Sequence, residues 1–160
     1  MEYSKVLAAV TGDASDEEVV SQAERLLRSE RGRLLILYVI KMDRSLPVDA
    51  EVTAEVLRGE AVLQRCEEGT RLPKGLVEAE LLQAREVGPA VVHEAAVRDV
   101  DAVVLGTSYP TAFGAFSLGA DIPYVLEHAP CHVVFIREPR PGARPSGAGG
   151  RNGRAGVRVD

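Results

Sequence analysis

The segment from Val103 to Arg137 constrains the fold more than any other part of the sequence. It opens with an apolar run that ends at Gly106, which is typical of a strand buried on both faces. The loop from Thr107 to Gly119 follows, and apolar residues at helical spacing then predict a helix that Pro130 ends. The apolar run from His132 to Ile136 predicts a second strand, so the segment indicates strand, loop, helix and strand.

The preceding chain repeats this alternation. We expect strands over Lys5–Val10, Arg33–Ile40 and Leu76–Leu82, and helices after the N-cap Ser15, over Ala50–Glu68, and from a first position at Pro89. The third strand carries two acids and is expected toward an edge. This order predicts an α/β fold, a doubly wound, five-stranded, mostly parallel sheet with helices on both faces. Ligands of such sheets bind beyond the carboxyl ends of the strands, at the switch point.

Composition and charge argue against several classes of protein. The formal net charge is −5, with no basic stripe or interleaved aromatics, so we expect no nucleic-acid partner. We expect no membrane partner, because no apolar run approaches the ~20 residues that span a bilayer. We expect no secretory signal, because the N-terminus has no basic region followed by an apolar stretch. Cys66, expected in a polar and mobile region, and Cys131, at the start of a core strand, predict no disulfide and a cytoplasmic location. The lone Cys131–His132 pair lacks the ligands of a zinc site, so no metal is expected.

The chain divides into two parts. Residues 1–138 are expected to form the single α/β domain, and residues 139–160 a disordered tail rich in Gly, Pro and Arg. Five arginines and only Asp160 lie in that tail, so the domain is more acidic than the total charge indicates.

Motifs at both ends of the domain carry a family resemblance. Leu118-Gly119 and the run Val125-Leu126-Glu127-His128-Ala129-Pro130-Cys131, with Gly88-Pro89 and the Ala-Val-Thr-Gly start, resemble the universal stress protein family over about residues 3 to 138. The resemblance implies a Rossmann-like fold of the adenine nucleotide alpha hydrolase type. It also implies a homodimer formed through the last strand, Val133–Ile136, and a pocket for ATP or another adenine nucleotide.

The loop pattern of the nucleotide-binding branch is altered here. That pattern is Gly, two residues, Gly, nine residues, then Gly with Ser or Thr. Gly106 and Gly119 match it, whereas Tyr109 replaces the middle Gly and Ala120 the hydroxyl residue. Asp121 follows and places a negative charge at the helix start. Added bulk, a lost hydroxyl donor and a like charge all oppose phosphate binding.

The resemblance implies further pocket positions. Thr11 stands where the family has an aspartate, and Asp13 is close enough to substitute for it in part. The expected pocket positions are therefore Thr11, Asp13, Val39, Gly106, Ser108, Tyr109, Gly119, Ala120 and Asp121.

Three functions were weighed. The first is a non-enzymatic, cytoplasmic and homodimeric stress-response adaptor or sensor with an altered nucleotide pocket and no certain cofactor. The alternative is an ATP-binding universal stress protein with nucleotide-dependent switching or slow hydrolysis. An adenylating enzyme of the ATP-pyrophosphatase type is remote, because Thr11–Ser15 lacks the Ser-Gly-Gly of that class. No catalytic residue is expected, since no Ser-His-Asp order or Gly-Lys-Ser motif is present.

Overall fold

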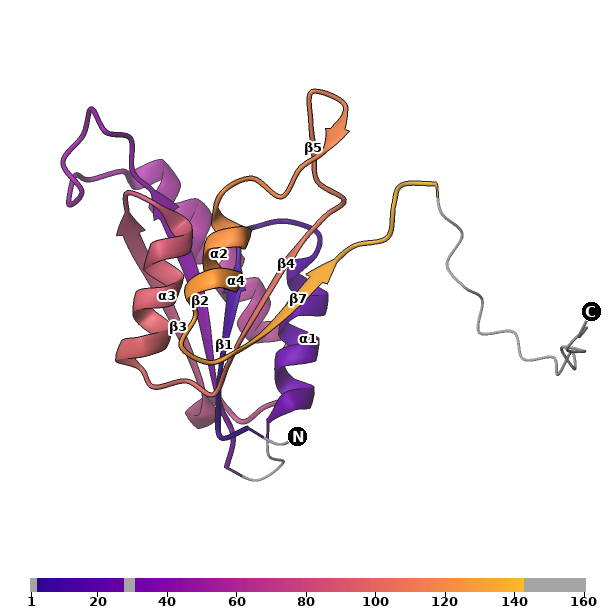
Figure 1. The fold of residues 1–160 in the computed structure, drawn as a ribbon. Coiled ribbons are helices and arrows are strands. Elements are labelled where there is room, and N and C mark those ends of the chain that lie inside the picture. The colour runs from indigo at the N-terminus through magenta and orange to yellow at the C-terminus, as the bar shows by residue number, and fades with distance from the viewer. Residues whose placement is uncertain (1–2, 28–30, 143–160) are drawn as a thin grey trace, which may run out of the picture.

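A central sheet of five parallel strands organises the computed structural model, which describes residues 3–27 and 31–142 (Figure 1). The strands lie in the order β3-β2-β1-β4-β7, and every neighbouring pair is parallel. This confirms the predicted fold class and the edge position of the third strand. The strands are β1 (Lys5–Val10), β2 (Arg33–Lys41), β3 (Val77–Ala84), β4 (Ala102–Thr107) and β7 (His132–Arg137).

Helices cover both faces of the sheet. The helices α1 (Asp16–Leu26) and α2 (Thr53–Gly69) pack on one face, and α3 (Val87–Val97) and α4 (Asp121–His128) on the other (Figure 1). A short 3-10 turn, Lys74–Leu76, leads into β3. Among the described residues, no helix is long and apolar enough to cross a bilayer.

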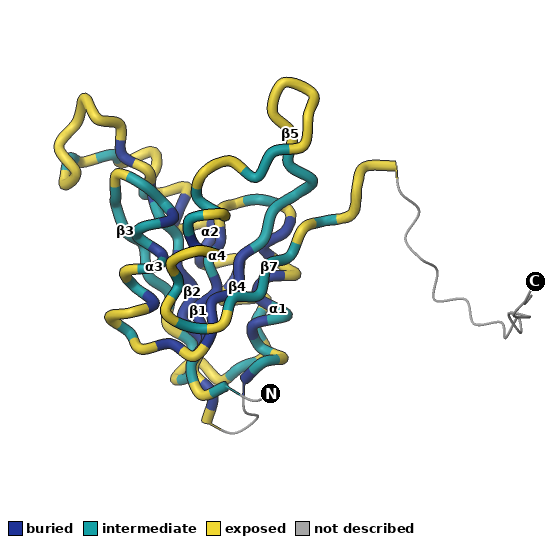
Figure 2. Tube along the Cα trace, in the orientation of Figure 1, coloured by how far each residue is buried: buried dark blue, intermediate teal, exposed yellow. Residues whose placement is uncertain are grey.

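The sheet separates two apolar cores. Side chains of β1 alternate between them, because successive residues of a strand point to opposite faces: Val6, Ala8 and Val10 enter the core under α1 and α2, and Leu7 the opposite core. Figure 2 shows the buried residues gathered along the central strands. Each large apolar side chain buried there stabilises the fold by about 1.5–3 kcal/mol.

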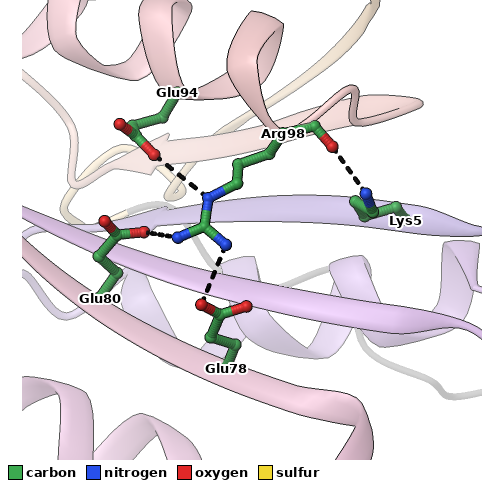
Figure 3. Close-up of polar contacts among 5 residues, drawn as sticks. All are labelled: Lys5, Glu78, Glu80, Glu94 and Arg98. Atoms are coloured by element: carbon green, nitrogen blue, oxygen red, sulfur yellow. Dashed lines mark hydrogen bonds and ion pairs between the residues drawn. The ribbon is translucent and has the colours of Figure 1, made fainter.

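The acidic edge strand β3 is held by one arginine of α3 (Figure 3). The guanidinium of Arg98 contacts Glu78 at 3.0 Å, Glu80 at 2.5 Å and Glu94 at 3.6 Å. The hydrogen bond that Arg98 donates to Glu78 and the negative charge of Glu80 raise the pKa of Arg98. Lys5 Nζ donates to the carbonyl oxygen of Arg98 at 2.7 Å. The cluster therefore ties the end of α3 to β1 and β3, and it compensates the two acids of the strand.

The loop after β4 contains a hairpin that the sequence analysis did not predict. The short strands β5 (Thr111–Ala112) and β6 (Ala115–Phe116) pair antiparallel around Phe113 and Gly114. In Figure 1 this hairpin projects beyond the carboxyl end of the sheet.

Several local predictions were wrong. Helix α2 begins at Thr53 rather than at Ala50, and Pro89 occupies the third rather than the first position of α3, which still leaves it within the first turn. Leu57, an apolar residue of α2, is 60% exposed and lies outside the core. Cys66 was expected in a polar, mobile region and is instead buried in the core under α2, because it lies on the inward face of that helix.

Helix α2 is continuous through Gly59, although glycine disfavours the interior of a helix. A Cβ at Gly59 would lie 2.5 Å from Leu81 and 2.8 Å from Tyr38, so the missing side chain lets α2 approach the sheet closely. A disordered tail was predicted over residues 139–160. Residues 143–160 of this tail lie outside the described residues.

Gly106 allows β4 to pass directly beneath α1, which makes it a test of the packing. A Cβ there would lie 2.6 Å from Cγ2 of the fully buried Val19 and 3.1 Å from the carbonyl oxygen of Ile136. We expect Gly106→Ala to lower the free energy of unfolding by about 1–3 kcal/mol through overpacking. Urea denaturation measures this change.

Gly69→Ala is the matched control, because nothing lies within 4 Å of a Cβ at that position. It should leave stability unchanged or raise it slightly through helix propensity. Equal unfolding free energies for the two variants would show that α1 does not press on Gly106.

Candidate functional site

The site lies at the switch point of the sheet. Strands β2 and β3 lie on one side of β1. The chain then crosses over, and β4 and β7 lie on the other side of β1. Ala9 pairs in register with Leu105, so the loops that leave β1 and β4 begin side by side at the carboxyl edge. This is the position where doubly wound sheets bind ligands.

Asp13 joins these two loops. Its carboxylate accepts a hydrogen bond of 2.6 Å from the Ser108 hydroxyl, 2.8 Å from the Ser15 amide, and a longer one of 3.4 Å from the Ser108 amide. Burial by itself would raise the pKa of Asp13, but these hydrogen bonds outweigh it and the pKa is lowered. The carboxylate therefore occupies donors of the β4 loop that an anionic ligand would otherwise use.

Asp16 closes the β1 loop from the first turn of α1. Its two carboxylate oxygens accept from the amide of Thr11 at 3.0 Å and from the amide of Gly12 at 2.7 Å. Gly12 has a φ of +83°, a conformation that glycine adopts without strain. Burial raises the pKa of Asp16 despite these two hydrogen bonds. Asp16 was not among the predicted site residues, because its sequence position indicated only an acid in a first helical turn.

Ser15 holds the expected N-cap position of α1, but its side chain makes no capping hydrogen bond. The residue is fully buried, and its Oγ has no hydrogen-bond partner in the structure. A Cβ at Gly106 would lie 3.3 Å from this oxygen. Ser15 thus packs beneath the β4 loop, whereas Asp16 binds two amides of the β1 loop.

The Asp121 carboxylate binds the start of α3 rather than the start of α4, the helix that Asp121 begins. The carboxylate accepts a hydrogen bond of 2.8 Å from the amide of Gly88, in the first turn of α3. A Cβ at Gly88 would lie 2.9 Å from the carbonyl oxygen of Asp121, so the two helix starts touch. Ala120, the N-cap residue of α4, offers no side-chain acceptor.

Tyr109 packs between the β5–β6 hairpin and the end of the edge strand β7. Its ring lies 5.3 Å from the ring of Phe116, and the guanidinium of Arg137, at the end of β7, lies 5.2 Å from the Tyr109 ring centroid. These contacts direct the segment after Ser108 toward β7. Tyr109 therefore has a packing role at the position where the nucleotide-binding pattern has glycine.

The structure brings together only some of the predicted site residues. Thr11, Asp13, Gly106 and Ser108 converge at the switch point, and Tyr109 follows directly. Val39 packs in the core under α3 and α4. Among the described residues, no hydrogen bond or ion pair joins Val39, Gly119 or Ala120 to the Asp13 cluster. The expected pocket positions are therefore divided between two places. Those in the loops after β1 and β4 are held together by hydrogen bonds within the protein.

A groove of about 780 Å³ runs beside this cluster, between α1 and α2. Asp13 and Asp16 line it, together with Arg65 and the buried Cys66. Burial raises the pKa of the Cys66 thiol to about 11, so it is a protonated packing group at neutral pH rather than a nucleophile. Within residues 3–27 and 31–142, no group of three or more His, Cys, Asp or Glu could hold a metal ion.

Known proteins with the same fold support an assignment to a family. The model of the universal stress protein family matches residues 2–137 of the chain. A universal stress protein of Synechocystis sp. is 25% identical over 153 residues, which cover 86% of this chain and 99% of that protein.

Solved structures show the same architecture at low identity. A universal stress protein from Archaeoglobus fulgidus in complex with dAMP has a TM-score of 0.64 at 18% identity, covering 84% of this chain and 98% of that one. A family member from Arabidopsis thaliana with AMP bound has a TM-score of 0.54 at 18% identity, covering 85% and 92%. A universal stress protein in complex with cAMP has a TM-score of 0.59 at 16% identity, covering 85% and 98%.

The bond between Asp13 and Ser108 should contribute to stability in a pH-dependent way. We expect Ser108→Ala to lower the free energy of unfolding at pH 7 by about 1–2 kcal/mol, since the lost hydrogen bond has a charged acceptor that is only partly buried. The folded pKa of Asp13 is lowered, so this contribution is complete above the unfolded pKa and disappears as pH falls through the folded value. The difference between variant and wild type should therefore be constant from pH 7 to about 5 and shrink below about pH 4.

Urea denaturation across this pH range provides the measurement. Ser21→Ala, on α1, is the control, because the Ser21 side chain makes no hydrogen bond to a described residue. A Ser108→Ala difference that persists unchanged at pH 2.5 would contradict the ionic character of the bond.

Proposed function

Because this chain belongs to the universal stress protein family, we propose that it is a non-enzymatic, homodimeric adaptor or sensor of the stress response in the cytoplasm. Its nucleotide pocket is altered so that protein groups replace the phosphates of a nucleotide. The observation that carries this proposal is the pair of internal carboxylate bonds, Asp13 to Ser108 and Asp121 to Gly88.

These bonds oppose triphosphate binding energetically. A phosphate at the β4 loop would have to displace the Asp13 carboxylate from the Ser108 donors, and each hydrogen bond to a charged group contributes about 1.5–3 kcal/mol. Asp121 adds a negative charge at the start of α4, where a bound anion would otherwise be stabilised by about 0.3–1 kcal/mol. Tyr109 is held against Phe116 and Arg137, so its ring cannot move aside without losing both contacts.

A second function has independent support. The related structures with cAMP, AMP and dAMP contain nucleotides that carry a single phosphate. Such a ligand needs fewer donors from the loop than ATP does. The alternative function is therefore an ATP-binding universal stress protein with nucleotide-dependent switching or slow hydrolysis. Binding of another adenine nucleotide, such as AMP, is a second form of this alternative.

Calorimetric titration separates the two proposals. Wild type should bind magnesium-ATP weakly or not at all. The triple variant Tyr109→Gly, Ala120→Ser, Asp121→Asn should gain about tenfold or more in affinity, a change that needs only ~1.4 kcal/mol. Asparagine at position 121 removes the charge but keeps an acceptor for the Gly88 amide.

The control for this titration replaces Tyr109 by Phe within the same triple variant. Phenylalanine retains the ring, so the gain should be lost if bulk at this position excludes the phosphate. AMP is titrated in parallel. Tight binding of ATP or AMP by wild type would overturn the altered-pocket proposal and favour the alternative.

The proposed dimer rests on the last strand. Strand β7 pairs only with β4, which leaves its other edge without a strand partner among the described residues. Val133 and Phe135 pack toward the core under α3 and α4, Val134 and Ile136 toward the core under α1, and all four side chains remain partly exposed. An edge strand with half-buried apolar residues on both faces favours pairing with another strand.

Sedimentation equilibrium tests this dimer. Wild type should be dimeric at tens of micromolar, and Val133→Arg and Val134→Arg should each weaken association on the order of a hundredfold, since each change occurs twice in a symmetric interface. Leu126→Arg, on the exposed side of α4, is the control and should leave association unchanged. Circular dichroism establishes that each variant is folded. A monomeric wild type at these concentrations would disprove the dimer.

A further inference from the structure

The tip of the β5–β6 hairpin combines two unfavourable features in one residue. Phe113 has a φ of +52° and is followed by Gly114 with a φ of +77°, the signature of a tight type I′ turn. Asn, Asp and Gly suit the first of these positions, whereas a bulky aromatic residue is strained there. Phe113 is also fully exposed, with a relative accessibility of 110%. Within the monomer, this side chain therefore adds strain and contacts no core.

The hairpin is apolar and uncharged throughout. From Thr107 to Ala120 the sequence has no charged residue, and Phe116, on the second hairpin strand, is 50% exposed. Figure 2 shows the exposed tip standing clear of the body of the molecule. Isolated exposed apolar residues are ordinary, but two aromatic residues on one projecting arm indicate an interaction surface.

This arm is continuous with the edge of the sheet. Tyr109 at its base packs between Phe116 and Arg137, the last residue of β7. The backbone adds a second link, because the amide of Glu138 donates to the carbonyl oxygen of Thr107 at 2.8 Å. The aromatic arm and the partly exposed apolar residues of β7 therefore form one surface at one edge.

The area available on β7 alone is small for a stable interface. The strand has six residues, so it extends about 20 Å and presents a strip of roughly 200 Å² if about 10 Å wide. A stable complex buries about 800 Å² on each partner. Each buried phenylalanine adds about 150–250 Å², so the arm supplies area that the strand lacks.

The uncharged arm is the part of this acidic domain where a second copy is repelled least. The total of −5 includes +4 from the residues after Glu138, which leaves −9 on residues 1–138. Two such domains repel each other except where their surfaces are uncharged, and the arm is an uncharged surface adjoining the free edge. The same negative charge disfavours anionic membranes and acidic peptides.

We propose that the β5–β6 hairpin is a dimerisation arm whose Phe113 and Phe116 pack against a second copy of this chain. The proposal rests on the β7 dimer of the proposed function. Antiparallel pairing of two β7 strands about a two-fold axis brings the carboxyl end of one strand beside the amino end of the other. Each arm, which projects beyond the carboxyl end of its own β7, then lies against the other copy.

Phe113→Asn is the decisive variant, because it has opposite effects on folding and association. Asn-Gly suits a type I′ turn, so the unfolding midpoint in urea, measured at a concentration where the protein is monomeric, should be unchanged or higher. The dimer should weaken about tenfold for each arm, and about a hundredfold for the pair, in sedimentation equilibrium. Phe113→Tyr retains the ring and should restore association.

The matched control is Leu57→Asn, which removes another exposed apolar side chain on α2, a helix that packs against β2 and β3 rather than β7. It should leave association unchanged. A Phe113→Asn dissociation constant equal to that of wild type, with Val134→Arg still disrupting the dimer, would overturn the arm and leave the β7 dimer standing. A monomeric wild type would overturn both. Sedimentation with vesicles of phosphatidylcholine and phosphatidylglycerol that depends on Phe113 would also overturn the proposal, in favour of a membrane contact.

Discussion

The burial of β1 and β4 on both faces is the constraint on which the rest of the structure depends. Both strands lie inside the sheet, and the side chains from Val6 to Ala8 and from Ala102 to Val104 are inaccessible to solvent. Two layers of helices are needed to cover such strands, and they leave only the strand ends open. The carboxyl ends of β1 and β4 are therefore the place where loops from distant parts of the chain meet.

Where these loops meet, backbone amides and the Ser108 hydroxyl donate hydrogen bonds to carboxylates of the same chain. Asp13 and Asp16 bind loop amides of β1 and β4, and Asp121 binds the start of α3 from the start of α4. Each carboxylate occupies a position where an anion would be favourable, and each is held by backbone donors that are already in place. The altered pocket that we propose thus rests on a consistent set of hydrogen bonds rather than on the loss of a single residue. The polar cluster of Arg98 lies near the amino end of the strands and has a structural role separate from this site.

The segment that would cover a phosphate instead forms a projecting hairpin. Tyr109 accounts for this, because its contacts with Phe116 and Arg137 direct the segment toward β7. The same substitution that removes the flexible glycine of the nucleotide-binding pattern therefore builds an aromatic surface at the dimer edge that we propose. In the function that we propose, this one change in the loop both opposes phosphate binding and adds contact area for a second copy.

The sequence by itself determined the fold class, and it predicted a candidate site at the carboxyl ends of the strands. Continuous apolar runs from Val103 to Leu105 and from Leu34 to Leu37 specify buried parallel strands, and the amphipathic helices between them specify the layers. The matches to the loop pattern at Gly106 and Gly119, and the replacements at Tyr109 and Ala120, were also visible there. Only the tertiary structure decided which donor each carboxylate binds. Asp13 reaches Ser108 across 95 residues and Asp121 reaches Gly88 across 33, and such pairings depend on how strands and helices are placed in space. The hairpin likewise has no signal in its composition, because Phe113 adopts a conformation that its residue type disfavours.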